Sequence, residues 1–142
     1  LIDDGTVEIV NEQDAELQEE GLDITEQILT ANPDVQMIWC WNQTSLLGCA
    51  AALQNAGKSD VVLMGTDMSV ELAKDMQSED ITLQAITTQM PYDMGYQAVE
   101  NAVKAVKGED VEKEIMIPTY TYTKENMDEI QTYIDEHQDL VG

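Results

Sequence analysis

The sequence predicts an α/β fold, a three-layer αβα arrangement built on a doubly wound parallel sheet. Short apolar runs typical of buried strands alternate along the chain with amphipathic segments of 10 to 17 residues. Parallel strands need such helical crossovers, and the helices then cover both faces of the sheet. With 142 residues and 43% hydrophobic content, residues 1–142 are expected to form a single unit around one core.

The first strand and the first helix are predicted from two different periodicities. Residues 6–10 (TVEIV) alternate and are β-branched, which is typical of a strand. Residues 14–31 carry apolar positions at helical spacing on an acidic surface, and this helix is expected to end before Asn32 and Pro33. Its expected buried stripe is Leu17, Gly21, Ile24 and Ile28.

The middle of the chain repeats a unit of strand, loop and helix. Strands are predicted at 37–41, 61–64 and 81–87 from short apolar or β-branched runs. Gly57 marks the C-terminal boundary of the helix after the first of these strands, and Ser69 is placed to cap the helix after the second. The inward residues are expected to be Leu46, Cys49, Leu53 and Ala56 on one helix and Leu72, Ala73 and Met76 on the other.

The C-terminal elements begin with a helix from Pro91 to Lys107, since proline is favoured at the first helical position and Gly108 follows. Residues 116–122 are strand-like, and the proline within them indicates an edge strand or a bend. Thr123 is expected to cap a last amphipathic helix. The inward stripes of the two helices are expected to be Met94, Ala98, Ala102 and Ala105, and Met127, Ile130 and Ile134.

The charge and the reactive residues exclude several functions. With 29 acidic residues against six lysines, the formal charge of −23 repels phosphate backbones, so no nucleic-acid partner is expected, while a basic partner surface would be attracted. Cys40 and Cys49 are interpreted either as free core thiols or as a strand-to-helix disulfide. The chain has one histidine, His137, and no zinc spacing, so no metal or cofactor is expected. No nucleophile is paired with a base, which predicts that the chain is not an enzyme.

Polar residues directly after three predicted strands are the candidate binding residues. They are Trp41 and Asn42, then Thr66 and Asp67, then Gln89. Ligands of doubly wound sheets bind beyond the carboxyl ends of the strands, where these residues would meet. Amides and a carboxylate match neighbouring hydroxyl groups, and an indole face can stack on a sugar ring. The same residue types also cap helices and close turns, which is the alternative interpretation.

Six segments of the chain follow one another in unbroken order: ANPDV (31–35), WNQTSLLG (41–48), ALQNAGKSDV (52–61), GTD (65–67), TQMPYDMG (88–95) and TKEN (123–126). Together they resemble the C-terminal half of the periplasmic sugar-binding proteins of the ribose and galactose type. The resemblance implies a two-lobe protein of which this chain forms an incomplete lobe, and it assigns sugar contacts to Asn42 and Asp67 and a place near the inter-lobe hinge to Gln89.

The chain departs from the family pattern at several positions. Thr66 stands where an aromatic residue is common, and Gln43 stands where an acidic residue is usual. Residues 13–18 contain no aromatic residue to stack on a sugar, and the chain has neither Phe nor Arg. Trp41 is a candidate replacement for the stacking surface, and the identity of the sugar stays open.

The expected function is that of an extracytoplasmic solute-binding component of an ABC importer that holds a sugar or polyol between two lobes. The start at Leu1, without a Met, indicates a cut inside a larger protein whose N-terminal lobe is missing. Residues 90–115 are expected to belong to that lobe in the intact protein. In isolation, the helix from Pro91 to Lys107 is expected to pack on the lobe that this chain forms or against a second copy of the chain, as a homodimer. The alternative is a ligand-sensing domain of the same fold that serves a receptor kinase or a transcriptional regulator.

Overall fold

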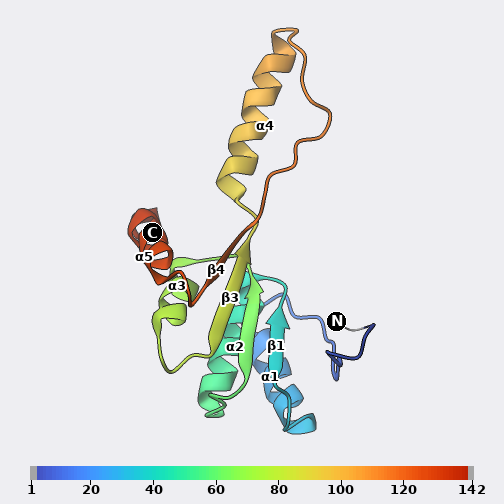
Figure 1. Cartoon of the computed structure of the whole chain (residues 1–142), viewed down its shortest axis with the longest axis vertical. Helices are drawn as coiled ribbons and strands as arrows, with labels where there is room; N and C mark the ends of the chain where they lie inside the picture. The colour runs from blue at the N-terminus through green and yellow to red at the C-terminus, as the bar shows by residue number, and fades with distance from the viewer. Residues whose placement is uncertain (1–2, 141–142) are drawn as a thin grey trace.

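The computed structural model describes residues 3–140, which form a four-stranded mixed sheet with helices (Figure 1). The strand order is β1-β2-β3-β4, with β1 to β3 parallel and β4 antiparallel to β3. The strands are β1 (Met37–Cys40), β2 (Val62–Thr66), β3 (Leu83–Thr88) and β4 (Tyr120–Thr123). The helices are α1 (Gln18–Ala31), α2 (Gln43–Asn55), α3 (Val70–Gln77), α4 (Pro91–Val106) and α5 (Met127–His137), followed by a 3₁₀ turn, Gln138–Leu140.

The core of the molecule lies on one face of this sheet. Cys40, Gly65, Ile86 and Tyr122 are paired in one row across the four strands. The side chains of Cys40, Ile86 and Tyr122 point toward the helices. The apolar faces of α2, α3 and α5 and the inner side of the sheet form a single buried cluster. Right-handed crossovers between successive parallel strands place α2 and α3 on the same side. Fully buried members of the cluster include Leu46, Leu63, Leu72, Met76, Leu83, Ile86 and Ile130.

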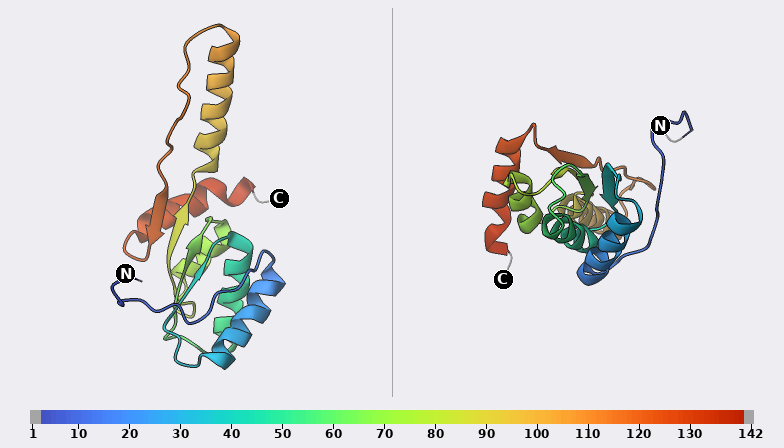
Figure 2. Two further views of the ribbon diagram at one scale, coloured as in Figure 1. Left: turned by 90° about the vertical axis from the view of Figure 1, so that its right-hand side faces the viewer. Right: turned by 90° about the horizontal axis from the view of Figure 1, so that it is seen from below.

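The opposite face of the sheet is open in the described part of the chain. Met37 and Trp39 alternate with the inward residues of β1, and Trp39 is 61% exposed. Figure 1 shows α1 and α2 behind the strands and no helix in front of them, and the turned views of Figure 2 show these helices on one side of the sheet. The predicted α/β class is confirmed, and the chain forms a partial lobe. In the described residues, the helices cover only one face of the sheet.

Helices α1 and α2 touch through two glycines. A Cβ atom added to Gly48 would lie 2.0 Å from the carbonyl oxygen of Gln18, and one added to Gly21 would lie 2.4 Å from that of Ser45. The buried positions of α1 are accordingly Gly21, Thr25 and Leu29. The predicted stripe of this helix was wrong at Leu17, which is 52% exposed, because backbone contact at the glycines decides which side faces α2.

Three further sequence predictions need correction. Residues 6–10 form no strand, because a strand is stabilised by a hydrogen-bonded partner and the described chain offers them none. The last strand is shorter than predicted and begins at Tyr120. Thr123 lies inside that strand, and the residue before α5 is Asn126, whose Oδ1 accepts a hydrogen bond from the Thr123 backbone N–H at 2.7 Å.

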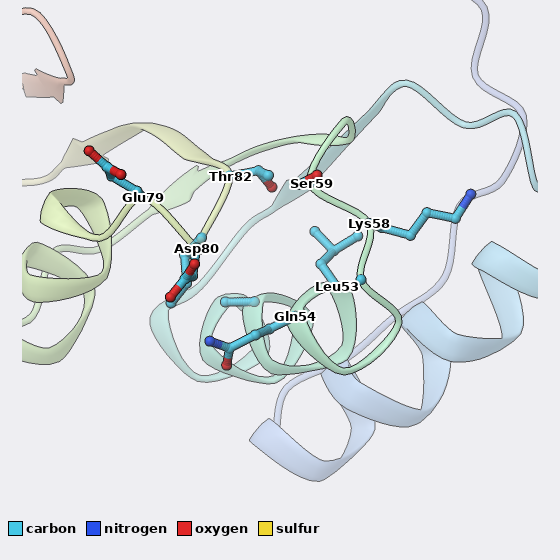
Figure 3. A pocket seen from close by; sticks show the side chains of 10 residues that line it. Leu53, Gln54, Lys58, Ser59, Glu79, Asp80 and Thr82 are labelled. Atoms are coloured by element: carbon cyan, nitrogen blue, oxygen red, sulfur yellow. The ribbon is translucent and has the colours of Figure 1, made fainter.

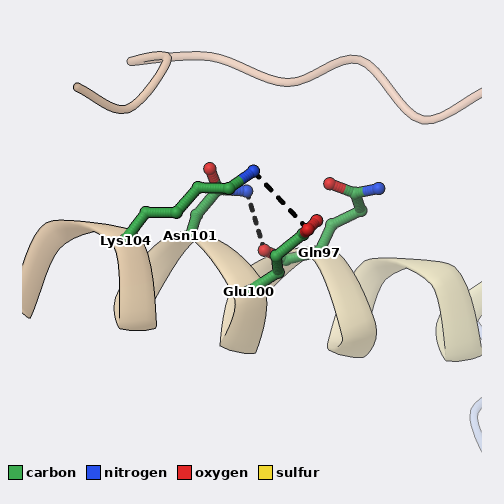
Figure 4. A network of polar contacts seen from close by, with 4 residues as sticks. All are labelled: Gln97, Glu100, Asn101 and Lys104. Carbon is green, nitrogen blue, oxygen red and sulfur yellow. Dashed lines mark hydrogen bonds and ion pairs between the residues drawn. The ribbon is translucent and has the colours of Figure 1, made fainter. Parts of the chain in front are cut away.

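Helix α4 stands away from the rest of the molecule, with the returning chain beside it (Figures 1 and 2). It begins at Pro91 and is followed by Gly108 with φ of 74°, as predicted. The predicted inward stripe was wrong, because no residue of α4 is buried. The returning chain faces polar side chains, including Asn101, which donates to the Gln97 carbonyl at 2.8 Å, and Lys104, which pairs with Glu100 at 3.5 Å (Figure 4). Helix α4 therefore does not pack on the lobe that this chain forms, and the other alternative, packing against a second copy of the chain, stays a prediction.

Among residues 3–140, no helix is both long enough and apolar enough to cross a membrane.

Candidate functional site

The candidate site lies at the carboxyl edge of the sheet, where β1, β2 and β3 end. The Thr66 hydroxyl donates to the Trp41 carbonyl and so connects the ends of β1 and β2. The Asp67 backbone N–H donates to the Thr87 carbonyl at 2.9 Å, and the Gln89 Nε2 donates to the Asp67 carboxylate at 2.8 Å. All five residues selected from the sequence, Asn42 included, therefore lie along one edge that we call the strand-end surface.

Directly after β1, the local contacts of Trp41 and Asn42 are structural. The indole N–H of Trp41 and the amide N–H of Asn42 both donate to the Ala15 carbonyl, at 3.2 and 3.3 Å. The Asn42 Oδ1 accepts from the Ser45 backbone N–H at 2.8 Å and thereby caps α2. The capping interpretation thus describes Asn42 correctly, whereas the ring of Trp41 remains 50% exposed.

The backbone at the ends of β2 and β3 adopts a conformation that is uncommon for residues with side chains. Asp67 has φ of 67° and Met90 has φ of 54°, both in the left-handed region. Such residues persist where the surrounding structure holds them, and they concentrate at binding sites and hinges. Asp67 is held by its backbone bond to β3 and by Gln89, so its carboxylate is presented in a fixed direction.

Sequence reasoning missed Tyr133 of α5, which supports the loop after β2. Its hydroxyl donates to the Met68 carbonyl at 3.1 Å, directly after Asp67. Burial raises the pKa of Tyr133, so its hydroxyl stays protonated and remains a donor. Its ring also packs edge-on against Tyr122 of β4. A tyrosine on an amphipathic helix carries no signal in the sequence that links it to a loop 65 residues earlier.

The chemistry of the strand-end surface is that of hydrogen bonding. Asp67 and Gln89 supply acceptors and donors, and the exposed indole of Trp41 supplies an apolar face. Within residues 3–140, no group of three or more His, Cys, Asp or Glu side chains could hold a metal ion. Such an edge suits a neutral molecule rich in hydroxyl groups.

A cavity of about 330 Å³ lies at the opposite, amino-terminal edge of the sheet (Figure 3). Its wall includes Gln54, Lys58, Asp80 and Thr82. The Lys58 ammonium group is directed away from it and donates to the Pro33 carbonyl at 3.0 Å. Because its lining residues precede β2 and β3, this cavity is separate from the strand-end surface.

Residues 2–110 match the family model of the periplasmic binding protein domain. The chain belongs to this family. It is 41% identical over 92 residues to the ribose import binding protein RbsB of Escherichia coli, an alignment that covers 65% of this chain and 30% of that protein. Among solved structures, a solute binding protein of an ABC transporter from Agrobacterium vitis, with bound D-fucose, has a TM-score of 0.74 and 30% identity.

The structural match extends over most of this chain but over less than half of its relatives. The Agrobacterium vitis comparison covers 83% of this chain and 40% of that one. The arabinose-binding component of an ABC transporter from Shewanella has a TM-score of 0.81 over 93% of this chain and 45% of its own, at 23% identity, and shows the fold alone. These relatives are binding components of transporters and not enzymes, in line with the prediction from the sequence.

Proposed function

We propose that this chain supplies one lobe of an extracytoplasmic solute-binding protein of an ABC importer, and that its strand-end surface contacts a sugar or polyol. The observation that carries this proposal is the hydrogen-bonded row that joins Trp41, Thr66, Asp67 and Gln89 across the ends of three strands. The named relatives support the ligand class, since they include proteins for ribose and for D-fucose.

Asp67 and Trp41 have the main parts in this proposal. The Asp67 carboxylate keeps free acceptor capacity beside its bond from Gln89 and accepts from sugar hydroxyls. Bonds to a charged group contribute about 1.5 to 3 kcal/mol, against about 1 kcal/mol for a neutral pair, so Asp67 dominates the polar contacts. The Trp41 ring packs against the C–H face of the sugar. Because a sugar carries no charge, the acidic chain does not repel it.

We further propose that the N-terminal lobe of a longer protein covers the apolar side of α4. Tyr96, Val99 and Val103 are 58%, 66% and 47% exposed there, while the polar side of α4 already faces the returning chain. The share of the relatives that this chain covers supports the same occupant. Closure of that lobe on the strand-end surface would desolvate the sugar, and the importer membrane subunits would receive it from the closed form.

Light scattering after size-exclusion chromatography, together with hydrogen exchange, tests the occupant of α4. The proposal predicts a monomer with fast-exchanging α4 amides, and slowed exchange after an N-terminal lobe polypeptide is added. A homodimer with protected α4 amides would contradict it and would assign this face to a second copy.

Isothermal titration with ribose, allose and D-fucose tests the ligand site. The charge-removing change Asp67→Asn is expected to weaken binding of the accepted sugar about tenfold, which corresponds to about 1.4 kcal/mol. Asp80→Asn, in the cavity at the other edge, is the matched control and should bind as the wild type does. Equal affinity of the Asp67→Asn variant and the wild type would overturn the assigned site.

A further inference from the structure

Two residues, Gln89 and Met90, connect β3 to α4, and this connection begins at the strand-end surface (Figure 1). The pairing of β3 with β4 ends one residue earlier, at Thr88 and Tyr120, so the connection itself has no ladder partner. Within residues 3–140, no side chain of α4 forms a hydrogen bond or an ion pair with another element. The direction in which α4 leaves the sheet therefore depends on what holds Gln89 and Met90.

Asp67 holds Gln89 through two hydrogen bonds that close a small ring. The Asp67 backbone N–H donates to the carbonyl of Thr87, two residues before Gln89, at 2.9 Å. The Asp67 carboxylate Oδ1 accepts from the Gln89 Nε2 at 2.8 Å. While both bonds are made, the segment from Thr87 to Gln89 cannot turn without moving the Asp67 carboxylate. The acceptor that the sugar meets and the start of the connection to α4 therefore share one hydrogen bond.

Met90 is the pivot of this connection. Its backbone lies in the left-handed region, with φ of 54° and ψ of 57°, and Pro91 begins α4 directly after it. A residue with a side chain persists in this conformation where the surrounding structure holds it, and the adjacent bond from Gln89 to Asp67 provides such a hold. Because no residue of α4 is buried, a change of φ at Met90 would swing the whole helix without breaking any packing.

We propose that Gln89 is a positioning residue that acts through Asp67 and couples the sugar site to the direction of α4. The coupling rests on the proposed function, since it takes Asp67 as an acceptor of sugar hydroxyls. The Gln89 amide holds the carboxylate in place before the sugar arrives, so binding has less to order. Coupling between two sites is reciprocal. A sugar that holds the carboxylate therefore also stabilises the bond to Gln89, and Gln89 then keeps Met90 and α4 in one direction.

Residual dipolar couplings of the backbone N–H groups, measured on the whole chain without sugar, test the connection itself. In the wild type, the couplings of α4 should be smaller than those of α2 but should fit the same alignment. The Gln89→Met variant keeps the length of the side chain and loses the amide, so its α4 couplings should shrink toward zero while those of α2 stay unchanged. Gln97→Met, within α4, is the matched control and should resemble the wild type.

A second variant shows whether Gln89 acts through Asp67. The Asp67→Gly change tolerates the positive φ of this position and removes the carboxylate, so adding Gln89→Met to it should cause no further loss of the α4 couplings. Wild-type α4 couplings in the Gln89→Met variant, or a further loss in the double variant, would overturn the role of this bond. Neither outcome depends on sugar binding.

The same couplings, recorded with ribose, allose and D-fucose, test the link to the sugar site. An accepted sugar should increase the α4 couplings of the wild type. The Gln89→Met variant should show no increase and should bind that sugar about fivefold more weakly. A sugar that binds at Asp67 without changing the α4 couplings would overturn the coupling and leave the proposed function intact, whereas absence of binding by all three sugars would overturn both.

Discussion

The body of the molecule and helix α4 have the same kind of amphipathic sequence, but the apolar residues are buried in the body and exposed in α4. In the body, which comprises α1 to α3, the sheet and α5, apolar side chains such as Leu63 and Ile130 are fully buried in one cluster. In α4, which has 16 residues, none is buried, and Tyr92 and Val106 are more than 80% exposed. An apolar stripe on a helix therefore predicts that this face is buried, but it does not identify the partner surface that buries it.

The two regions should also differ in stability. Isolated helices of about 15 residues are marginal in water, because most helical stability in proteins comes from packing of an apolar face. The backbone hydrogen bonds of α4 are therefore expected to open far more often than those of α2, which is packed on both α1 and the sheet.

Ile130→Ala should give the largest loss of stability. Ile130 is fully buried in the body, and removal of a buried aliphatic side chain costs about 2 to 5 kcal/mol. Val99→Ala in α4 is the matched change, and because Val99 is 66% exposed its effect should stay within about 0.5 kcal/mol. Urea denaturation followed by circular dichroism measures both. Similar losses in the two variants would mean that α4 is packed.

Gly48→Ala should cost about 1 to 3 kcal/mol, because the new Cβ atom would meet the Gln18 carbonyl oxygen at 2.0 Å and force α1 away from α2. In α4, a Cβ atom on Gly95 would meet nothing within 4 Å. Gly95→Ala should stabilise α4 by the difference in helix propensity between glycine and alanine, which is about 0.8 to 1 kcal/mol. Thermal unfolding measures the stability of both variants. A Gly48→Ala variant as stable as the wild type would show that α1 and α2 do not approach so closely.

Tyr133→Phe should lower the free energy of unfolding by about 0.5 to 1.5 kcal/mol, since the Met68 carbonyl loses its hydrogen bond. The exposed Tyr96 of α4 provides the control, and Tyr96→Phe should leave stability unchanged. Because Met68 follows Asp67, the Tyr133 variant should also shift the backbone amide resonance of Asp67. Unchanged stability and an unchanged resonance would show that Tyr133 does not support this loop.

Asp75→Asn should give a small gain in stability at neutral pH. Burial and the neighbouring charge of Glu71 raise the pKa of Asp75, so the folded state binds this proton more tightly than the unfolded state does. The wild type therefore loses stability from this group as the pH rises through the folded pKa, and the variant does not. Denaturation at pH 3 and pH 7 should show a gain only at pH 7, and an equal effect at both would contradict the assignment.

Local sequence signals predicted the boundaries of several elements correctly. Ser69 caps α3 through a bond to the Leu72 backbone N–H, Pro91 begins α4, and Gly57 and Gly108 adopt positive φ after their helices. Each of these outcomes depends on residues close together in the sequence. The predicted parallel topology also placed the residues that follow β1, β2 and β3 at one edge of the sheet, because the carboxyl ends of parallel strands must meet there.

The failures concern partners that are distant in sequence or outside the described chain. Residues 6–10 have the composition of a strand, yet a strand forms only beside another one. The stripe of α1 is set by the contact of Gly21 and Gly48 with the facing helix, a property of the pair rather than of either segment. The contact between Tyr133 and the Met68 carbonyl likewise exists only once α5 has docked.

The most direct test of the proposed binding surface is a two-dimensional amide NMR titration of this chain with ribose, allose and D-fucose. The account predicts concentration-dependent shifts, for at least one of these sugars, that concentrate at Trp41, Asn42, Asp67 and Gln89. Amides of α4 and of Gln54 and Asp80 in the opposite cavity should not move. Saturable shifts confined to that cavity, or no saturable shift at the four strand-end residues with any of the three sugars, would contradict it.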